Sequence, residues 1–510
     1  MPRVVTGATT PADADPAVSL TASREPEPLL YLARLPSYPW LVVGTVCVGA
    51  FMGQLDASIA QLVLPTLETT FHARLILVDW VALAYLLALG ATLPIFGRLA
   101  DMVGRKLLYT GGFLLFVAGS ALCGFAPTLY FLIGARVFQA IGAGLLQANS
   151  VAIITTAAGP ERRGRAIGLQ GAAQAIGLSL GPALGGVLIQ TLGWRWVFWI
   201  NVPAGLLGAV LGWLVLPQTR GLRPGQHFDW GGAVLLGPAL TALLLAVNEG
   251  RRWGWISPPL LACAIGGLVL LAAFVGHERR TASPLIDLRL FSVPAFTTGN
   301  VAGLLSYGIL FALFFLLPFD FERGYGHTPL ATGLLLTTVP LALGVVAPLS
   351  GRLSETVGAR PLTVTGMALV AVALLALAVL LTGQSATLPL VIGALVVFGV
   401  GQGLFTAPNN SAIMGAASPE RLGVAGGVLN ITRTLGTSLG VAIATVVFAG
   451  RLSALVGHVI RTAQAPRAAV LVGVRDTLLL FAVVALVAAG LSLVRGNVPS
   501  PSDTAPDREG

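Results

Sequence analysis

Charged residues are scarce in this chain. Only 10% of its 510 residues are Asp, Glu, Lys or Arg, whereas 55% are hydrophobic and the mean hydropathy is +0.85. A soluble domain carries roughly 25% charged residues. The composition therefore excludes an ordinary water-soluble globular protein, and it predicts that most of the chain is surrounded by lipid.

Residues that bind metals or form disulfides are also few. The three cysteines, Cys47, Cys123 and Cys263, all lie within apolar runs, where we expect them to act as small core residues. The five histidines are scattered, and no Gly-Lys-Ser/Thr phosphate-binding sequence occurs. The sequence indicates no metal site, no cofactor and no catalytic triad, so we do not expect an enzyme.

Acidic residues are outnumbered by basic ones. The chain has 30 Lys and Arg against 21 Asp and Glu, which gives a net charge of +9. A nucleic-acid-binding protein gathers its basic residues into a patch, whereas here they are spread thinly through short loops. Most of them fall on the side that carries the amino terminus. This asymmetry predicts cytoplasmic termini and argues against a nucleic-acid partner.

Long apolar runs dominate what is present. A hydrocarbon core of about 30 Å needs roughly 20 apolar residues per helix, and the chain contains fourteen such runs. They predict an all-α integral membrane protein with two six-helix bundles and two extra central helices. The runs cover residues 40–64, 78–97, 107–126, 129–156, 166–190, 197–216, 230–248, 258–276, 296–318, 329–350, 361–382, 388–413, 422–448 and 475–495.

The flanking segments differ in composition from these runs. The first 38 residues are polar and rich in Pro and Ala, with no early apolar core, so we expect a disordered tail and no cleavable signal peptide. The predicted division is a cytoplasmic tail (1–38), a six-helix bundle (39–217), two linking helices with cytoplasmic loops (218–294), a second six-helix bundle (295–496) and a cytoplasmic tail (497–510).

Two polar patterns occur twice. Residues 97–106, GRLADMVGRK, recur as GRLSETVGAR at residues 351–360. The Pro-Glu-Arg sequence at 160–162 is followed by two glycines, and residues 419–427 repeat that arrangement. Two matched pairs at nearly constant spacing predict two related halves.

One acid lies well inside a predicted span. Asp56 is that acid, and Arg136 reaches a similar depth on an antiparallel span by the helical rise of 1.5 Å per residue. Intramembrane acids usually face an aqueous cavity and serve a function. Our hypothesis is that Asp56 carries a coupling proton and that Arg136 holds its charge when the proton leaves. The alternative is a static ion pair that locks two helices.

Polar side chains also form stripes on several spans. Arg136, Gln139 and Gln147 share one helical face, and Asn430 and Arg433 share another. We expect such stripes to line a central pathway, although interhelical hydrogen bonding explains any single Gln or Asn equally well. Arg433 requires a counter-charge or an anionic ligand. The predicted cavity residues are Gln54, Gln61, Gln139, Gln147, Asn149, Gln170, Gln174, Asn430 and Arg433.

These residues resemble a known family. Residues 97–106 resemble the loop between spans two and three of the major facilitator superfamily, and residues 136–144 resemble its span-four motif. Residues 177–186, GLSLGPALGG, are similar to the span-five motif of antiporters. Residues 55–65 and 194–203 look like the 14-span drug:proton antiporters within it. The resemblance covers about residues 40–495.

The resemblance implies roles for two glycine-rich motifs. Asp101 is expected to cap the start of span thirteen near Leu422 and to act as a conformational latch. The glycine motif of span five is expected to seal the pathway against proton leak, and the alternative is that it serves helix packing alone. The expected latch residues are Gly97, Asp101, Gly104, Arg105 and Glu355, and the expected antiporter-motif residues are Gly177, Gly181, Pro182, Gly185 and Gly186.

The sequence departs from the family pattern at several positions. Ala359 replaces the base of the first loop, Ser58 and Gln61 replace a threonine and an asparagine, and Val441 replaces the proline of span five. Asp320 and Glu322 follow Pro318 at a predicted outer helix end. We expect them to be solvated loop charges, with a second proton or cation site as the alternative.

The function implied by the resemblance is proton-coupled efflux of amphipathic drugs or antibiotics by alternating access, in a bacterial plasma membrane. The expected partners are substrate, protons and lipid, and the working unit is a monomer. Asp56 favours cationic or neutral cargo, while Arg136 and Arg433 oppose a cation. The alternatives are a dedicated exporter of one metabolite or antibiotic, an importer, and a membrane sensor or scaffold that transports nothing.

Overall fold

The protein is helical throughout its described part. The computed structural model describes residues 25–73, 75–78, 80–219, 228–254, 256–281, 284–418, 421–457 and 466–494, and the regular structure within these ranges consists of helices alone. Fourteen helices in these ranges are long and apolar enough to cross a membrane. The predicted fold class and number of spans are therefore confirmed.

The amino-terminal half contributes six of these spans. Its helices pack into one bundle, in which α2 lies against α7 and α6 lies between α4 and α5. Their bounds are α1 Leu30–Ala33, α2 Tyr38–Thr70, α3 Leu75–Val78, α4 Trp80–Val103, α5 Arg105–Gly124, α6 Leu129–Ala158, η1 Pro160–Arg162, α7 Arg163–Thr191, α8 Trp196–Trp199 and α9 Asn201–Val215.

The carboxy-terminal half repeats this arrangement after two linking helices. The linking pair is α10 Trp230–Trp253 and α11 Pro258–Glu278, followed by η2 Leu288–Ser292. The second bundle contains α12 Pro294–Phe319, the π-helix η3 Asp320–Gly324, α13 Pro329–Val357, α14 Ala359–Leu380, η4 Ser385–Thr387, α15 Leu388–Gly415, α16 Leu422–Val456 and α17 Arg467–Val494.

Local sequence explains where several helices begin. Thr128 and Thr328 accept hydrogen bonds from the N–H groups of Phe131 and Ala331, and Asp229 accepts one from Gly232. These are N-cap interactions, which satisfy N–H groups that have no partner within the first helical turn.

Glycine makes the turns in the two repeated loops. Gly104 separates α4 from α5 with a φ of 123°, and Gly358 separates α13 from α14 with a φ of 84°. Side chains with a Cβ rarely adopt such angles, so glycine is needed at the same place in both copies. We call the end of the molecule that carries residues 97–106 and 351–360 the loop end, and the opposite end the far end.

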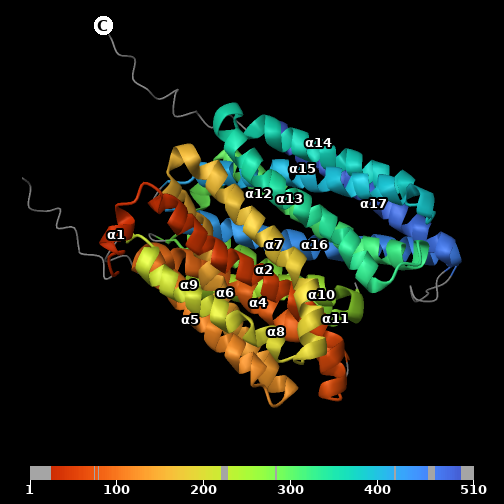
Figure 1. The fold of residues 1–510 in the computed structure, drawn as a ribbon, viewed down its shortest axis with the longest axis horizontal. Coiled ribbons are helices and arrows are strands. Elements are labelled where there is room, and N and C mark those ends of the chain that lie inside the picture. The colour runs from red at the N-terminus through yellow and green to blue at the C-terminus, as the bar shows by residue number, and fades with distance from the viewer. Residues whose placement is uncertain are drawn as a thin grey trace, which may run out of the picture.

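The two bundles lie side by side (Figure 1). At the seam, α4 packs against α16 and α7 packs against α13. The linking helix α10 packs against α11 and also against α4 and α16. The linking pair therefore borders one edge of the seam between the bundles.

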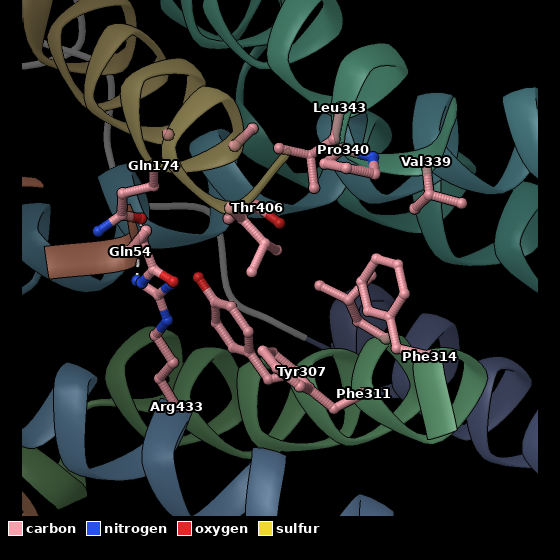
Figure 2. A pocket seen from close by; sticks show the side chains of 14 residues that line it. Gln54, Gln174, Tyr307, Phe311, Phe314, Val339, Pro340, Leu343, Thr406 and Arg433 are labelled. Atoms are coloured by element: carbon pink, nitrogen blue, oxygen red, sulfur yellow. Dashed lines mark hydrogen bonds between the residues drawn. The ribbon is translucent and has the colours of Figure 1, made fainter. Parts of the chain in front are cut away.

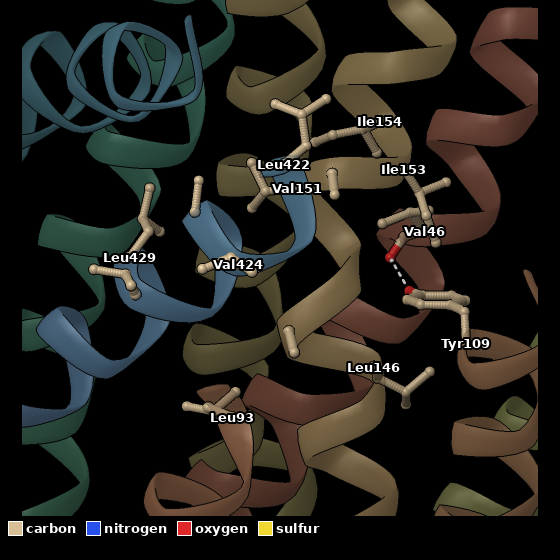
Figure 3. Packing of buried hydrophobic residues seen from close by; sticks show 14 of the residues in the cluster. Val46, Leu93, Tyr109, Leu146, Val151, Ile153, Ile154, Leu422, Val424 and Leu429 are labelled. Carbon is tan, nitrogen blue, oxygen red and sulfur yellow. Dashed lines mark hydrogen bonds between the residues drawn. The ribbon is translucent and has the colours of Figure 1, made fainter. Parts of the chain in front are cut away.

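One apolar cluster crosses the seam near the loop end. Figure 3 shows Leu422, Val424 and Leu429 of α16 beside α6 residues such as Val151. Tyr109 of α5 donates a hydrogen bond to the carbonyl oxygen of Val46 at 3.2 Å in the same region. A second cluster lies wholly within the carboxy-terminal bundle. The seam at the loop end is thus a packed protein core.

The predicted amino-terminal tail differs from the structure. Residues 1–24 and the predicted tail 497–510 lie outside the described residues, but the segment 25–38 is attached to the amino-terminal bundle at several points. Glu25 is only 3% exposed, and its carboxylate accepts a hydrogen bond from the N–H of Leu107 at 3.2 Å. Lys106 donates to the carbonyl oxygen of Pro26 at 2.8 Å. A buried carboxylate that caps α5 orders this segment, whose polar composition suggested disorder.

Candidate functional site

Residues 97–106 meet the start of α16. Asp101 Oδ2 accepts a hydrogen bond from the N–H of Val424 at 3.2 Å, and Oδ1 accepts two from the Arg105 guanidinium at 2.8 and 3.1 Å. Because α16 begins at Leu422, Val424 lies in its first turn, where the helix dipole favours an anion. The carboxylate of one half therefore caps a helix of the other.

The second loop makes the equivalent contact in reverse. Glu355 Oε1 accepts a hydrogen bond from the N–H of Arg165 at 2.9 Å, and Arg165 lies in the first turn of α7. Each half thus supplies the acid of one contact and the helix start of the other.

Glycines allow the backbones to meet beside these acids. A Cβ atom on Gly97 would lie 2.6 Å from the carbonyl oxygen of Gly423, and a Cβ on Gly164 or Gly351 would clash with the backbone of the other. A larger side chain does not fit while the contacts are made. The loop end is closed in this structure.

Asp56 lies inside the amino-terminal bundle, where it is 2% exposed. Its Oδ2 accepts a hydrogen bond from Arg136 at 2.8 Å, and its Oδ1 accepts from Gln139 at 3.0 Å and from Asn201 at 2.8 Å. Gln139 also donates to the hydroxyl of Ser120 at 2.7 Å. Side chains from α2, α5, α6 and α9 therefore meet around one carboxylate.

The cation of this pair is enclosed as well. Arg136 is 1% exposed, and its guanidinium lies 4.1 Å from the ring centroid of Tyr85. Its Nε donates to the carbonyl oxygen of Val81 at 3.2 Å. Removing either member of a buried ion pair leaves an uncompensated charge, so the two groups depend on each other.

The cavity between the bundles does not include the Asp56–Arg136 pair in its lining. It holds about 520 Å³ of space free of protein atoms, open solvent included, between α2 and α7 on one side and α12, α13, α15 and α16 on the other. Figure 2 shows Tyr307, Phe311 and Phe314 along one wall, with Gln54 and Gln174 near Arg433. The wall is mostly apolar, with polar groups gathered at one side, which is typical of small-molecule sites.

Arg433 is the charged member of this lining. Its Nη1 donates to Gln174 Oε1 at 2.9 Å, and its guanidinium lies 4.9 Å from the ring centroid of Tyr307. Within the described part of the chain, both of these contacts are to neutral groups. The charge is therefore held in place but not neutralised by them.

Three of the nine predicted cavity residues line this cavity: Gln54, Gln174 and Arg433. The side chain of Gln61 lies outside the described residues. The lining does not include the other five, so their role in a pathway stays a prediction. Gln139 contacts Asp56, Gln170 donates to Ser150, Asn149 bonds back to Leu145, and Asn430 bonds to the carbonyl oxygen of Gln147.

The glycine motif of α7 packs closely within its own bundle. A Cβ on Gly177 or Gly181 would clash with Phe51 or Ser58 of α2, which belongs to the same bundle. Gly185 is buried, a Cβ on Gly186 would meet open space, and the side chain of Pro182 is outside the described residues. The close contact with the other bundle is made nearer the loop end of α7, at Gly164 and Gly168.

Sequence reasoning missed some residues that the structure brings to these places. Asn201 lies within the motif 194–203, but nothing in the sequence indicates that its side chain donates to Asp56. Tyr307, Phe311 and Phe314 lie in a continuous apolar run that gives no sign of which face meets a cavity. Their spacing of four and three places them on one helical face, which was an available signal.

Comparison with known proteins finds relatives among membrane transporters. The model of the Major Facilitator Superfamily matches residues 46–441 and 299–509. The riboflavin transporter RibZ of Clostridioides difficile is 35% identical over 81% of this chain and 89% of its own length. A multidrug resistance protein B homolog of Mycobacterium tuberculosis is 32% identical, covering 86% and 81%. A tetracenomycin C resistance and export protein of Streptomyces glaucescens is 30% identical, covering 81% and 77%.

Two solved structures share the fold. The human organic anion transporter MFSD10 aligns with a TM-score of 0.63 and 16% identity, over 89% of this chain and 99% of its own. The proton:xylose symporter XylE aligns with a TM-score of 0.64 and 14% identity, over 91% and 97%. At these identities the likeness concerns the fold alone.

Proposed function

The chain belongs to the major facilitator superfamily of transporters, and on this premise we propose that it is a proton-coupled exporter of amphipathic compounds in a bacterial cell membrane. The single observation that carries the proposal is the buried pair of Asp56 and Arg136, tied to Gln139 and Asn201. The negative charge of such a carboxylate can be balanced in two ways, by a bound proton or by the neighbouring arginine, and the pair can alternate between them.

In the proposed cycle, the structure corresponds to the state closed at the loop end, which we place in the cytoplasm. Protonation of Asp56 removes the charge that holds Arg136 and loosens the helices around it. The two crossed contacts at Asp101 and Glu355 then break, and the bundles rock open toward the cytoplasm. Asp56 does not line the cavity, so the proton and the substrate have separate binding sites. Each therefore acts on the other through the helices of the amino-terminal bundle.

The sequence favours amphipathic drugs or antibiotics in general, and the cavity lining supports a narrower class of substrate. Arg433 is its charged lining residue, and Tyr307, Phe311 and Phe314 offer aromatic surfaces. A cationic substrate would meet repulsion there, so we propose neutral or anionic aromatic compounds. The names of relatives, a riboflavin transporter and a tetracenomycin exporter, also favour aromatic cargo, whether as one dedicated metabolite or as many drugs.

The proposal is tested with purified protein in liposomes. An imposed proton gradient should drive accumulation of a fluorescent anionic or neutral dye against its concentration gradient, and collapse of the proton gradient should release it. An importer would move dye with the proton flow. A sensor or scaffold would move none, and either result would overturn the proposal.

The Asp101 contact gives a first prediction. Asp101→Ala removes a charge-assisted bond to Val424, and such bonds contribute about 1.5–3 kcal/mol. We expect turnover to fall about tenfold, because 1.4 kcal/mol corresponds to a factor of ten, with dye affinity unchanged. Transport rates and equilibrium binding measure the two effects. An unchanged rate would show that this contact does not govern the transition.

The charge of Arg433 gives a second prediction. Arg433→Gln should raise the Kd of an anionic dye roughly tenfold, by loss of a charge-assisted hydrogen bond, and should leave a neutral aromatic dye little changed. Arg433→Lys is the matched control, since it keeps the charge and loses the planar guanidinium. Tighter binding of a cationic dye by the unmodified protein would contradict the substrate class.

A further inference from the structure

A second acid is buried at the far end of the carboxy-terminal bundle. Asp320 begins the π-helix η3, directly after α12, and its side chain is 0% exposed. The sequence suggested a solvated loop charge, and the structure differs. Phe321, the next residue, and Leu317, three residues earlier, are also fully buried. The wider turn of the π-helix rotates the acid from the helix end into the bundle, and such turns often occur at functional sites.

The carboxyl group has no hydrogen-bond partner within the described part of the chain. Both Oδ1 and Oδ2 are buried and unpaired there. Burying an ionised carboxylate without a partner is far more costly than burying a neutral acid. The geometry therefore fits the protonated form of Asp320 in this conformation.

Few charged groups surround this acid. Between Pro294 and Phe319, α12 has none, and α13 has its first at Arg352, at the loop end. On η3 itself, Glu322 and Arg323 are exposed. In the following turn, the ring of His327 stacks on that of Tyr325 with centroids 5.8 Å apart. These groups leave the buried carboxyl without a cation of its own.

The cation that can reach it comes from α17. Arg467 acts electrostatically on Asp320, yet its guanidinium donates to the carbonyl oxygen of Gly383 at 2.5 Å. A Cβ on Gly383 would lie 2.6 Å from the carbonyl oxygen of Gly324, the last residue of η3. The other α17 charges near this end are Arg475 and Asp476, which pair at 3.1 Å, and Asp476 also pairs with Arg451 of α16. Arg467 is thus held beside the π-helix by a neutral acceptor.

The helix that leads into Asp320 also forms the cavity wall. Tyr307 lies thirteen residues earlier on α12, about 20 Å away at 1.5 Å per residue, and its ring lies beside Arg433. Further along the same wall, Phe311 and Phe314 line the cavity. A change at η3 therefore acts on an element that touches the substrate.

We propose that Asp320 is a second proton-binding site, which takes up and releases a proton as the far end of the carboxy-terminal bundle rearranges. On release, the carboxyl O–H bond breaks, the proton passes to water at the far end, and the carboxylate accepts hydrogen bonds from Arg467 in place of Gly383. The ion pair draws α17 toward η3 and shifts α12 along the cavity. This inference rests on the proposed proton coupling and adds a second site to it.

The test compares Asp320→Asn with Glu322→Gln, an exposed acid two residues away that serves as the matched control. Infrared spectra of the purified protein report protonated carboxyl groups directly and need no transport. We expect a protonated-acid band that disappears as the pH is raised, that is missing from Asp320→Asn, and that remains in Glu322→Gln. In Arg467→Gln the band should persist to higher pH, because the carboxylate loses its cation.

Transport in liposomes provides the second measurement. Asp320→Asn should lower gradient-driven dye accumulation about tenfold, within the range of energies that couple two sites, while exchange of labelled for unlabelled dye continues. Identical spectra for Asp320→Asn and the unmodified protein would overturn the inference, as would a band that no pH removes. If the unmodified protein ignores the proton gradient, the proposed function fails, but the infrared titration still shows whether Asp320 exchanges a proton.

Discussion

Asp56→Asn should abolish transport driven by a proton gradient, down to the background of empty liposomes. The variant keeps the size of the side chain and one acceptor oxygen, which can still accept the bonds from Gln139 and Asn201. It cannot bind and release a proton. It also leaves Arg136 buried without its counter-charge, which destabilises a protein by about 3–5 kcal/mol. Thermal unfolding of the purified variant measures this second effect, and dye accumulation measures the first.

The double variant Asp56→Asn with Arg136→Gln separates coupling from structure. Removing both charges should restore most of the lost stability, because no unpaired ion remains in the bundle. Transport should stay absent. If the double variant transports dye in response to a proton gradient, the pair only locks helices together, and another group carries the proton.

Gly97→Ala should have the second-largest effect. Its Cβ would lie 2.6 Å from the carbonyl oxygen of Gly423, and a backbone atom in a packed seam cannot move aside as a flexible side chain can. Overpacking typically costs about 1–3 kcal/mol, and since 1.4 kcal/mol is a factor of ten, the closed population should fall by roughly five- to a hundred-fold. Transport should fall with it, since every cycle passes through the closed state.

The closed population can be measured with spin labels placed on α4 and α16 at the loop end. The distance distribution should shift toward longer values in Gly97→Ala, and Gly164→Ala should produce the same shift through the mirror contact. Gly134→Ala is the control, because a Cβ there meets open space. Unchanged distances in Gly97→Ala would show that the seam accommodates the methyl group.

The sequence predicted those features that depend on length, spacing or repetition. Fourteen spans follow from apolar runs, the pairing of Asp56 with Arg136 follows from helical rise, and the contact of Asp101 with the start of α16 follows from the family resemblance. Glu355 is predicted as a latch residue, but the sequence does not identify its partner at the start of α7. The spans and the depth of the ion pair are thus encoded by composition and periodicity, whereas the Asp101 contact is implied by the resemblance.

Other features depend on what a helix meets in three dimensions. Gln139 lies on a polar face, but whether that face meets a cavity or a buried carboxylate is decided by the neighbouring helices. Asp320 looked like a loop charge because the π-helix that turns it inward has no sequence pattern distinct from an α-helical end. Glu25 lies in a polar segment, and its order comes from the free N–H groups at the start of α5.

The crossed arrangement at the loop end limits how this protein can be recombined with its relatives. Asp101 of one half needs the first turn of α16, and Glu355 of the other needs the first turn of α7. A chimaera that joins one bundle of this protein to the other bundle of a relative replaces one partner in both contacts at once, so either contact can be lost. Chimaeras with closed loop ends therefore need donors whose glycines and helix starts match at all four surfaces, whatever substrates the donors carry.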